Sequence, residues 1–364
     1  MDSRVACVLI ALGISWLVLA AEGRRIANRS ESLIPARRIT SVMDAVPLAE
    51  ALQKIRTETS LEVMADTELL KYSVSLPRSG MTVWLALQEI AKQTSSRIQL
   101  EQQGQAIRLK PRQNLAALDS VTGPFRVVVQ QIDCRHLFET GITVTDLTLD
   151  IHWEPWLPVI RLDAQPQQLK VSDDRGSQVI AQTAPGKVAP FGALHRTTVR
   201  LLGVPRAATR LTSVEGAFTV TAAPTWLAFE FSRIPVTGGD GEPGTLPPGI
   251  DSSGVSARLL RFEKFEDFWE AEIRLDYPPG HPEFESFESW TAGNRVRLFR
   301  ADQGISIPAS DPEISERGRI ATGIYRFPRA KAPQGLRDAR LIVETPAALR
   351  EFAVSFRLEN IPLP

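Results

Sequence analysis

The chain has 364 residues, and its 42 lysine and arginine residues balance 42 aspartate and glutamate residues, so its formal net charge is zero at pH 7. No clustered basic run is present, which argues against nucleic acid as a partner, because electrostatic affinity for nucleic acid needs a concentrated positive surface. Of the two cysteines, Cys7 lies in the N-terminal apolar segment and Cys134 is alone in the rest. An intrachain disulfide is therefore excluded from the mature chain, whose domains must be held together by buried apolar cores.

The first twenty residues have the pattern of an export signal. Arg4 provides a weak positive start, and an almost unbroken apolar run extends from Val5 to Ala20. Val18 and Ala20 fit the small-residue rule for cleavage after Ala20. An uncleaved anchor is the alternative, and it is the only membrane contact that the sequence suggests. We therefore expect an exported chain, located in the periplasm or cell envelope, in which residues 21–37 form a polar tether.

Residues 38–112 are expected to form a small α+β domain with the order β-α-β-β-α-β-β. One helix is expected to begin at Pro47, where a missing N–H group costs little, and a second at Met81-Thr82. A ten-residue pattern occurs twice, 35 positions apart, and gives both helices apolar residues at helical spacing. The two apolar stripes are Leu48, Ala51, Leu52 and Ile55, and Val83, Ala86, Leu87 and Ile90. Two helices packed on one face of a small sheet would bury both stripes.

The same region resembles the short N-terminal domain of secretins and TonB-dependent receptors. The resemblance rests on VPLAEALQKI at 46–55, on the segment 69–76, and on GMTVWLALQEIAKQTS at 80–95. That family has no catalytic residues, and the resemblance implies a periplasmic module that binds neighbouring domains or signalling partners. The segments that follow lack the ~10-residue alternating strands of a membrane barrel, so the resemblance does not extend to pore formation.

Residues 118–364 contain a second, larger duplication. LTLDIHWEP at 147–155 matches AEIRLDYPP at 271–279, VSDDRG at 171–176 matches FRADQG at 299–304, and further matches follow in the same order. Both copies alternate apolar and polar residues between regularly spaced turns, without a helical stripe. This pattern favours two tandem β-sandwich repeats, over 118–236 and 255–364. The Gly- and Pro-rich segment 237–254 is expected to be the linker between them.

No residue pattern indicates a catalytic, cofactor-binding or metal-binding site. The spacing of an HExxH helix is absent, as is a Cys-x-x-Cys pair. The four histidines are expected to be structural or on the surface: His136, His152, His195 and His281. The segment 173–176 could form a calcium or acid–base site, but its counterpart replaces one carboxylate with Ala301, which favours a turn. Cys134, beside Arg135 and His136, could be a reactive thiol, although a lone cysteine is more often inert.

Several tryptophans of the duplicated region could form a stacking platform for sugars. Aromatic residues of β-sandwiches more often pack in the core or along an edge, and that interpretation is favoured here. The residues concerned are Trp153, Trp156, Trp226, Trp269 and Trp290. Trp156 follows the end of its strand and is expected to be the most exposed of them.

These observations leave three hypotheses about function. The leading one is a non-enzymatic envelope protein, tied to secretion or envelope signalling, whose domain at 38–112 binds a protein partner by strand addition to an open sheet edge. The second is a carbohydrate- or polymer-binding protein in which the tandem sandwiches combine two weak sites. The third, a hydrolase with a site assembled across domains, is disfavoured because no paired titratable groups stand out. Nothing in the sequence specifies the oligomeric state.

Overall fold

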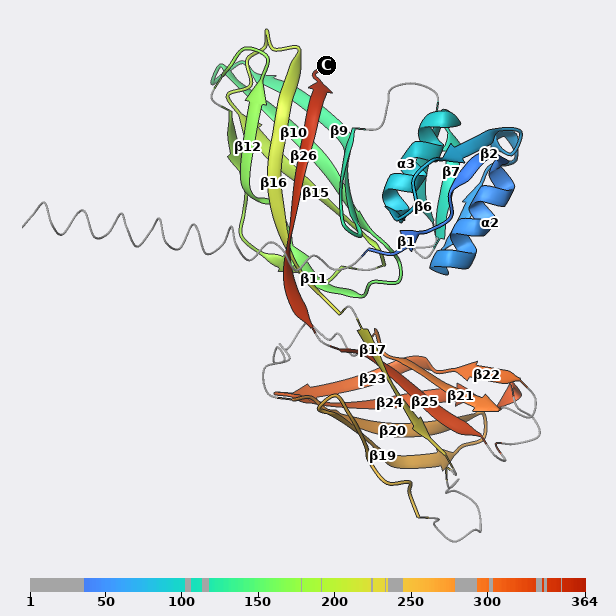
Figure 1. The fold of residues 1–364 in the computed structure, drawn as a ribbon. Helices are drawn as coiled ribbons and strands as arrows, with labels where there is room; N and C mark the ends of the chain where they lie inside the picture. Colours follow the sequence, from blue (N-terminus) through green and yellow to red (C-terminus); the bar gives the residue numbers. More distant parts are fainter. Residues whose placement is uncertain are drawn as a thin grey trace, which may run out of the picture. The chain divides into compact units, whose positions relative to one another are not determined.

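The computed structural model describes residues 36–101, 106–112, 118–177, 179–190, 192–223, 225–232, 234, 245–278, 293–300, 304–331, 336, 339–347 and 349–364. The expected signal segment, His281, Trp290, most of the expected tether and residues 237–244 of the expected linker lie outside these residues. The described chain is mostly β-structure arranged in several sheets (Figure 1). Within this part of the chain, neither of the α-helices has the length and apolar composition needed to span a bilayer.

The chain divides into two compact units. Unit 1 comprises the residues up to Val220 together with Glu351–Pro364, and unit 2 comprises Thr221–Arg350. This division differs from the predicted repeats 118–236 and 255–364, because strand pairing and not chain order decides which strand belongs to which core. The final strand of the chain lies in unit 1, although the sequence places it in the second repeat.

The first segment of unit 1 contains the helices α2 (Leu48–Thr59) and α3 (Val83–Gln93) and a short 3-10 helix η1 (Thr67–Leu69). Its strands form three small sheets, β1-β5, β2-β4 and β3-β7-β6, and β7 runs parallel to β3 and antiparallel to β6. The strands are β1 (Arg38–Ile39), β2 (Met43–Pro47), β3 (Glu62–Ala65), β4 (Ser73–Leu76), β5 (Met81–Thr82), β6 (Ser96–Glu101) and β7 (Ala106–Pro111).

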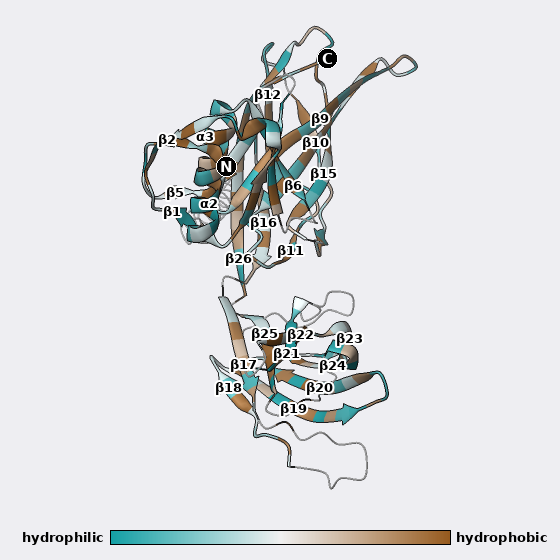
Figure 2. Ribbon diagram, turned by 90° about the vertical axis from the view of Figure 1, so that its right-hand side faces the viewer, coloured by the Kyte–Doolittle hydropathy of each residue, from teal (hydrophilic) through white to brown (hydrophobic). Residues whose placement is uncertain are grey.

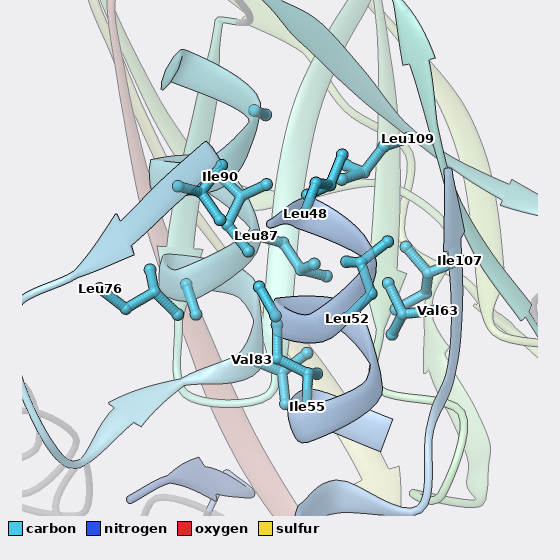
Figure 3. Close-up of a cluster of buried hydrophobic side chains, with 14 of the residues drawn as sticks. Leu48, Leu52, Ile55, Val63, Leu76, Val83, Leu87, Ile90, Ile107 and Leu109 are labelled. Carbon is cyan, nitrogen blue, oxygen red and sulfur yellow. The ribbon is translucent and has the colours of Figure 1, made fainter. Parts of the chain in front are cut away.

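The core of this segment is built from the two helical stripes. All eight stripe residues are buried, and Figure 3 shows side chains of α2 and α3 pointing toward one another and toward Val63, Ile107 and Leu109. Each fully buried aliphatic side chain stabilises the fold by about 1.5–3 kcal/mol. The helical spacing of the apolar residues therefore contributes directly to the stability of the segment.

The repeated Thr-Ser pair ends both helices in the same way. Thr59 Oγ1 donates to the Ile55 carbonyl at 2.6 Å, and Thr94 Oγ1 donates to the Ile90 carbonyl at 2.8 Å. The serine that follows each threonine has a positive φ, 55° at Ser60 and 50° at Ser95, which turns the chain out of the helix. The ten-residue repeat thus specifies a helix together with its end.

The rest of unit 1 is a β-sandwich. One sheet has the order β13-β15-β10-β9-β8, and the other has the order β12-β16-β11-β14, with β26 also paired to β16. Its strands are β8 (Asp119–Thr122), β9 (Phe125–Leu137), β10 (Ile142–Trp153), β11 (Val159–Asp163), β12 (Gln167–Asp173), β13 (Ile180–Gln182), β14 (Lys187–Val188), β15 (Leu194–Leu202), β16 (Arg210–Ala222) and β26 (Arg350–Pro362). Apolar and polar residues alternate along many of these strands, as expected where one face lies in a core (Figure 2).

Unit 2 is also made of two sheets around one core. Their orders are β18-β19-β20-β24-β23 and β17-β25-β21-β22, and residues of both sheets share a single buried cluster. The strands are β17 (Thr225–Phe231), β18 (Ile250–Ser252), β19 (Val255–Lys264), β20 (Phe268–Asp276), β21 (Arg295–Arg300), β22 (Ile305–Pro308), β23 (Ser310–Arg317), β24 (Ile320–Pro328) and β25 (Arg340–Ala347), followed in chain order after β24 by the 3-10 helix η4 (Arg329–Lys331). Strand β18 corrects the predicted linker 237–254: Ile250 pairs with Ala257 and packs against the core, so the end of that segment is structural.

Candidate functional site

A cleft of about 520 Å³ lies along α3 in unit 1. Helix α3, the edge strand β6, and residues of β8 and β9 contribute its walls. The lining residues are Arg78, Met81, Leu85, Gln88, Glu89, Ala91, Lys92, Ser96, Arg97, Ile98, Arg112, Asp119 and Arg126. We call this feature the α3 cleft. Its volume is within the ordinary range for ligand sites in proteins.

The apolar part of the α3 cleft comes from the helix and the strand beside it. Leu85, on the first turn of α3, lies outside the buried helical stripe and is 43% exposed. Met81 is half-buried, and Ile98 of β6 is almost fully buried. An exposed leucine over a sheltered apolar wall is a surface against which the side chains of a ligand can be buried.

The charge in the α3 cleft is unbalanced. Five cationic residues line it against the two carboxylates Glu89 and Asp119. Within the described chain, four of the five cations have no carboxylate at ion-pair distance: Arg78, Lys92, Arg97 and Arg112. Positive charges gathered along a cleft with low-dielectric walls attract and hold an anionic ligand.

The fifth cation, Arg126, is fixed in the wall. Its Nε donates to Asp119 Oδ2 at 2.6 Å, and its side chain is only 3% exposed. Burial lowers the pKa of Arg126, and the charge of Asp119 and its hydrogen bond oppose that effect. Because Asp119 neutralises Arg126, this arginine forms part of the cleft wall but adds no net charge to it.

A row of polar side chains extends from Arg126 across the neighbouring strands of the sandwich sheet. Arg126 lies opposite His152 in the β9–β10 pairing, and Asp150 lies opposite Arg196 in the β10–β15 pairing. Arg196 binds both oxygens of Asp150, at 2.7 and 2.8 Å. Burial works against ionisation of Asp150, but the hydrogen bonds from Arg196 and His152 lower its pKa.

Trp84 of helix α3 packs over this row of polar side chains. The Trp84 and His152 rings lie 6.2 Å apart, and Trp84 Nε1 donates to the Pro124 carbonyl at 2.8 Å. Burial lowers the pKa of His152, with a further contribution from the Arg126 charge, while Asp150 acts in the opposite direction. The structural role expected for His152 therefore takes a specific form, a buried imidazole at the contact between the helical segment and the sandwich.

A second contact between the same two parts is built around Glu154. Its Oε2 accepts hydrogen bonds from the Arg37 backbone N–H, at 3.2 Å, and from Trp156 Nε1, while Oε1 is buried without a partner. The Arg37 guanidinium lies 5.3 Å from the centre of the Trp156 ring and donates to the Thr59 carbonyl. Burial raises the pKa of Glu154 to about 7, although Trp156 and Arg37 oppose the shift. We call this cluster the Glu154 junction.

The Glu154 junction fixes the environment of Trp156, the tryptophan that the sequence indicates as the likeliest of its group to be exposed. Its side chain is half-buried, as that of Trp226 is, and it packs against the core of the helical segment. Trp153 and Trp269 lie in cores, and Trp226 stacks on Arg295 with the guanidinium carbon 4.4 Å from the ring centre. These described tryptophans do not line the α3 cleft.

The remaining candidates from the sequence lie apart from the α3 cleft. Asp173 Oδ1 accepts from the backbone N–H groups of Arg175 and Ser177, both at 2.9 Å, so the segment is a turn closed by an aspartate side chain. Cys134 is exposed on β9, 3.4 Å from Thr145 Oγ1. His136 is exposed beside Phe138, and His195 Nε2 lies 3.1 Å from the Ala164 carbonyl. Across the described residues, His, Cys, Asp and Glu side chains do not gather in threes that could hold a metal ion.

The cleft residues could not be identified from the sequence as a group. Arg78, Arg97, Arg112 and Arg126 stand in four separate segments, and no motif joins them. One sequence feature pointed to this region, the open edge expected for the small sheet. Strand β6 forms one edge of that sheet, and its residues line the cleft.

The α3 cleft combines guanidinium and ammonium groups with an apolar wall and the edge of a strand. The chain was also compared with proteins already known. No protein-family model, curated protein or solved structure matches it.

Proposed function

We propose that this chain is a non-catalytic interaction module of the bacterial cell envelope that holds an extended, acidic segment of a partner protein in the α3 cleft. The observation that carries the proposal is a set of four cations around an apolar wall, Arg78, Lys92, Arg97 and Arg112, which have no carboxylate partner among the residues that the structure describes. Carboxylates of a partner would complete the missing ion pairs, and guanidinium groups bind carboxylates in a bidentate manner.

The position of β6 supports an extended partner. In the order β3-β7-β6 it pairs on one side only, with β7, so its second edge can accept a strand. Three residues of β6 line the cleft: Ser96, Arg97 and Ile98. A strand added along β6 would gain backbone hydrogen bonds, and its acidic side chains would reach the cations around it.

The cellular setting rests on the sequence. The apolar segment that ends at Ala20 supports export, and the resemblance of residues 38–112 to the short N-terminal domain of secretins and TonB-dependent receptors supports a protein partner. In this proposal the two sandwich repeats serve as a spacer or a further interface. No cofactor is part of the proposed function.

Charge reversal in the α3 cleft tests the proposal. The probe is a short fluorescent peptide of alternating glutamate and valine, and fluorescence anisotropy measures its binding. We expect Arg97→Glu with Arg112→Glu to weaken binding at least roughly tenfold, because two attractive ion pairs become repulsive. Binding to the native chain should also weaken steeply toward ~1 M salt, where the Debye length falls to about 3 Å.

The matched control places the same charge change elsewhere. Arg56→Glu with Lys71→Glu alters the net charge by the same amount at positions outside the cleft. The control variant should bind the peptide as the native chain does. Equal loss in both double variants would show that the peptide responds to overall charge, and unchanged binding in the cleft variant would exclude the α3 cleft as the site.

A further inference from the structure

The two units contain the same arrangement of strands. In unit 1 the first sandwich sheet has the order β13-β15-β10-β9-β8, and in unit 2 the corresponding order is β23-β24-β20-β19-β18. The sequence match between LTLDIHWEP and AEIRLDYPP places β10 and β20 at equivalent positions, at the centre of the two sheets. The duplication predicted from scattered sequence matches is thus also visible in the order of the strands.

The second sheets correspond in the same way, with one difference. The segment VSDDRG begins near the end of β12, and the matching segment FRADQG begins near the end of β21. This match makes the two strands equivalent. Strand β16 pairs with β12 and with β11, which precedes β12 in the chain, and it also pairs with β26; strand β25 pairs with β21 and also with β17. The place that β17 occupies in unit 2 is therefore occupied in unit 1 by β26.

The sequence assigns these two strands the other way round. Leu227, Phe229 and Phe231 of β17 align with Val354, Phe356 and Leu358 of β26, at a constant offset of 127. The same offset aligns the Ile-Pro pair at 234–235 with that at 361–362. Strand β17 is thus the last strand of the first copy and β26 the last strand of the second, and each lies in the unit of the other copy.

Strand β26 is fitted closely into unit 1. The Phe356 ring stacks on Phe218 with centroids 5.6 Å apart, and a Cβ atom at Gly216 would lie 2.9 Å from Phe356 Cζ. Arg357 N–H donates to Ser120 Oγ at 3.2 Å, and Thr122 Oγ1 donates to the Ser355 carbonyl at 2.6 Å. A glycine where the aromatic ring needs room, hydrogen bonds to β8 and pairing with β16 together mark a slot shaped for this strand.

Short connections explain how the strands can be exchanged. Strand β16 ends at Ala222 and β17 begins at Thr225, and β25 ends at Ala347 and β26 begins at Arg350. A two-residue connection would suit a hairpin if each repeat kept its own last strand. If the hairpin connection opens, the strand can instead occupy the equivalent slot in the other unit, or in another chain, with little loss of contacts. This exchange is the basis of domain swapping.

We propose that the two repeats exchange their last strands within one chain, and that the slot beside β16 is an interaction surface for β26 of a second copy of this chain. Two chains that donate β26 reciprocally form a closed two-fold dimer with the same contacts as the monomer. Within one chain, the tether gives β26 a high effective concentration, so the monomer prevails in dilute solution. The dimer forms when chains fold together at high concentration.

A disulfide trap in the full chain tests the exchange. Cys7→Ser and Cys134→Ser first remove the native thiols. Ser120→Cys with Arg357→Cys should then form a disulfide within the monomer, because the two residues are neighbours in unit 1. The matched control is Ser120→Cys with Glu230→Cys, since Glu230 is the counterpart of Arg357 at the offset of 127. The control should form no disulfide, and a disulfide in the control with none in the first variant would overturn the exchange.

Mixed chains test the second copy as partner. One chain carries Ser120→Cys and the other Arg357→Cys, both without the native thiols. After unfolding and joint refolding over a range of concentrations, we expect a disulfide-linked dimer that contains both chains and increases with concentration. Mixing the two chains after separate folding should give no such dimer within the same time. If joint refolding gives only unlinked monomers at every concentration, the slot does not accept a strand from a second copy.

Discussion

At the scale of single residues, Glu154 and His152 show how burial changes a side chain that the sequence presents as ordinary. Both belong to the expected strand and turn LTLDIHWEP, and neither lies in a motif. Both become buried because the helical segment covers the outer face of the sandwich sheet at this point. Their pKa values shift in directions that make the charged forms less favourable, upward for Glu154 and downward for His152.

The shift at Glu154 predicts a pH-dependent stability. Its pKa is about 7 in the fold against an ordinary value of 4.5, so the folded state binds a proton more tightly than the unfolded state between these values. The free energy of unfolding of unit 1 should therefore fall as pH rises from 4.5 to 7, by an amount of order 3 kcal/mol. Glu154→Gln should remove this slope and make unit 1 more stable than the native protein at pH 8. Denaturant unfolding at a series of pH values measures the effect.

The quantity to compare is the difference in free energy of unfolding between the Glu154→Gln variant and the native protein at each pH. His152 acts in the opposite direction, since its lowered pKa removes stability as pH falls below about 6.5. Glu50→Gln, on the exposed side of α2, is the control and should leave the pH profile as it is. A native protein and a Glu154→Gln variant with parallel pH profiles would show that the Glu154 carboxyl titrates as it does in water.

At the scale of elements, the sequence indicated the helices well. The expected starts at Pro47 and Met81-Thr82 agree closely with the observed helices α2 and α3, because apolar spacing and end signals act within a few residues. The ends differ in how they are stabilised. Thr82 Oγ1 accepts a hydrogen bond from the Leu85 backbone N–H at 3.4 Å, whereas α2 has no side-chain cap at Pro47.

The cap at Thr82 predicts a local loss of stability. Thr82→Ala removes the acceptor for a helix N–H group and should lower the free energy of unfolding by about 1 kcal/mol. Thr57→Ala, an exposed position inside α2, is the same substitution without a cap and should be neutral or slightly stabilising, because alanine is the better helix former. Urea unfolding of both variants measures the difference, and equal effects would show that Thr82 does not act as a cap.

At the scale of the whole molecule, chain order and unit membership are not the same. Unit 2 is continuous, from Thr221 to Arg350, whereas unit 1 is completed by the last residues of the chain. Five apolar side chains of β26 are buried: Phe352, Val354, Phe356, Leu358 and Ile361. The core of unit 1 therefore depends on a strand that is made after all of unit 2.

Removal of residues 351–364 should affect the two units differently. Unit 1 loses a buried strand with two phenylalanines, each worth up to about 3 kcal/mol of burial, and should unfold at a lower temperature. Unit 2 retains all of its strands and should keep its transition. Hydrogen exchange should show lost protection in β8 and β16 and unchanged protection in β19, β20 and β25. The opposite pattern would place β26 in unit 2.

Local sequence pattern was sufficient to predict the helices with their buried stripes, the strand-rich character of the remainder and the collinear order of the matching segments in 118–364. These features follow from the spacing of apolar residues and from turn chemistry, which act over short distances along the chain. The long-range fold brought together the residues of the α3 cleft, buried Glu154 beside the half-buried Trp156, and set which core each last strand completes. These features depend on residues that are far apart in the chain: Arg97 and Arg126 line the same cleft, Arg37 donates to Glu154, and Phe218 stacks on Phe356. Two nearly equivalent slots for one kind of strand cannot be distinguished by local pattern.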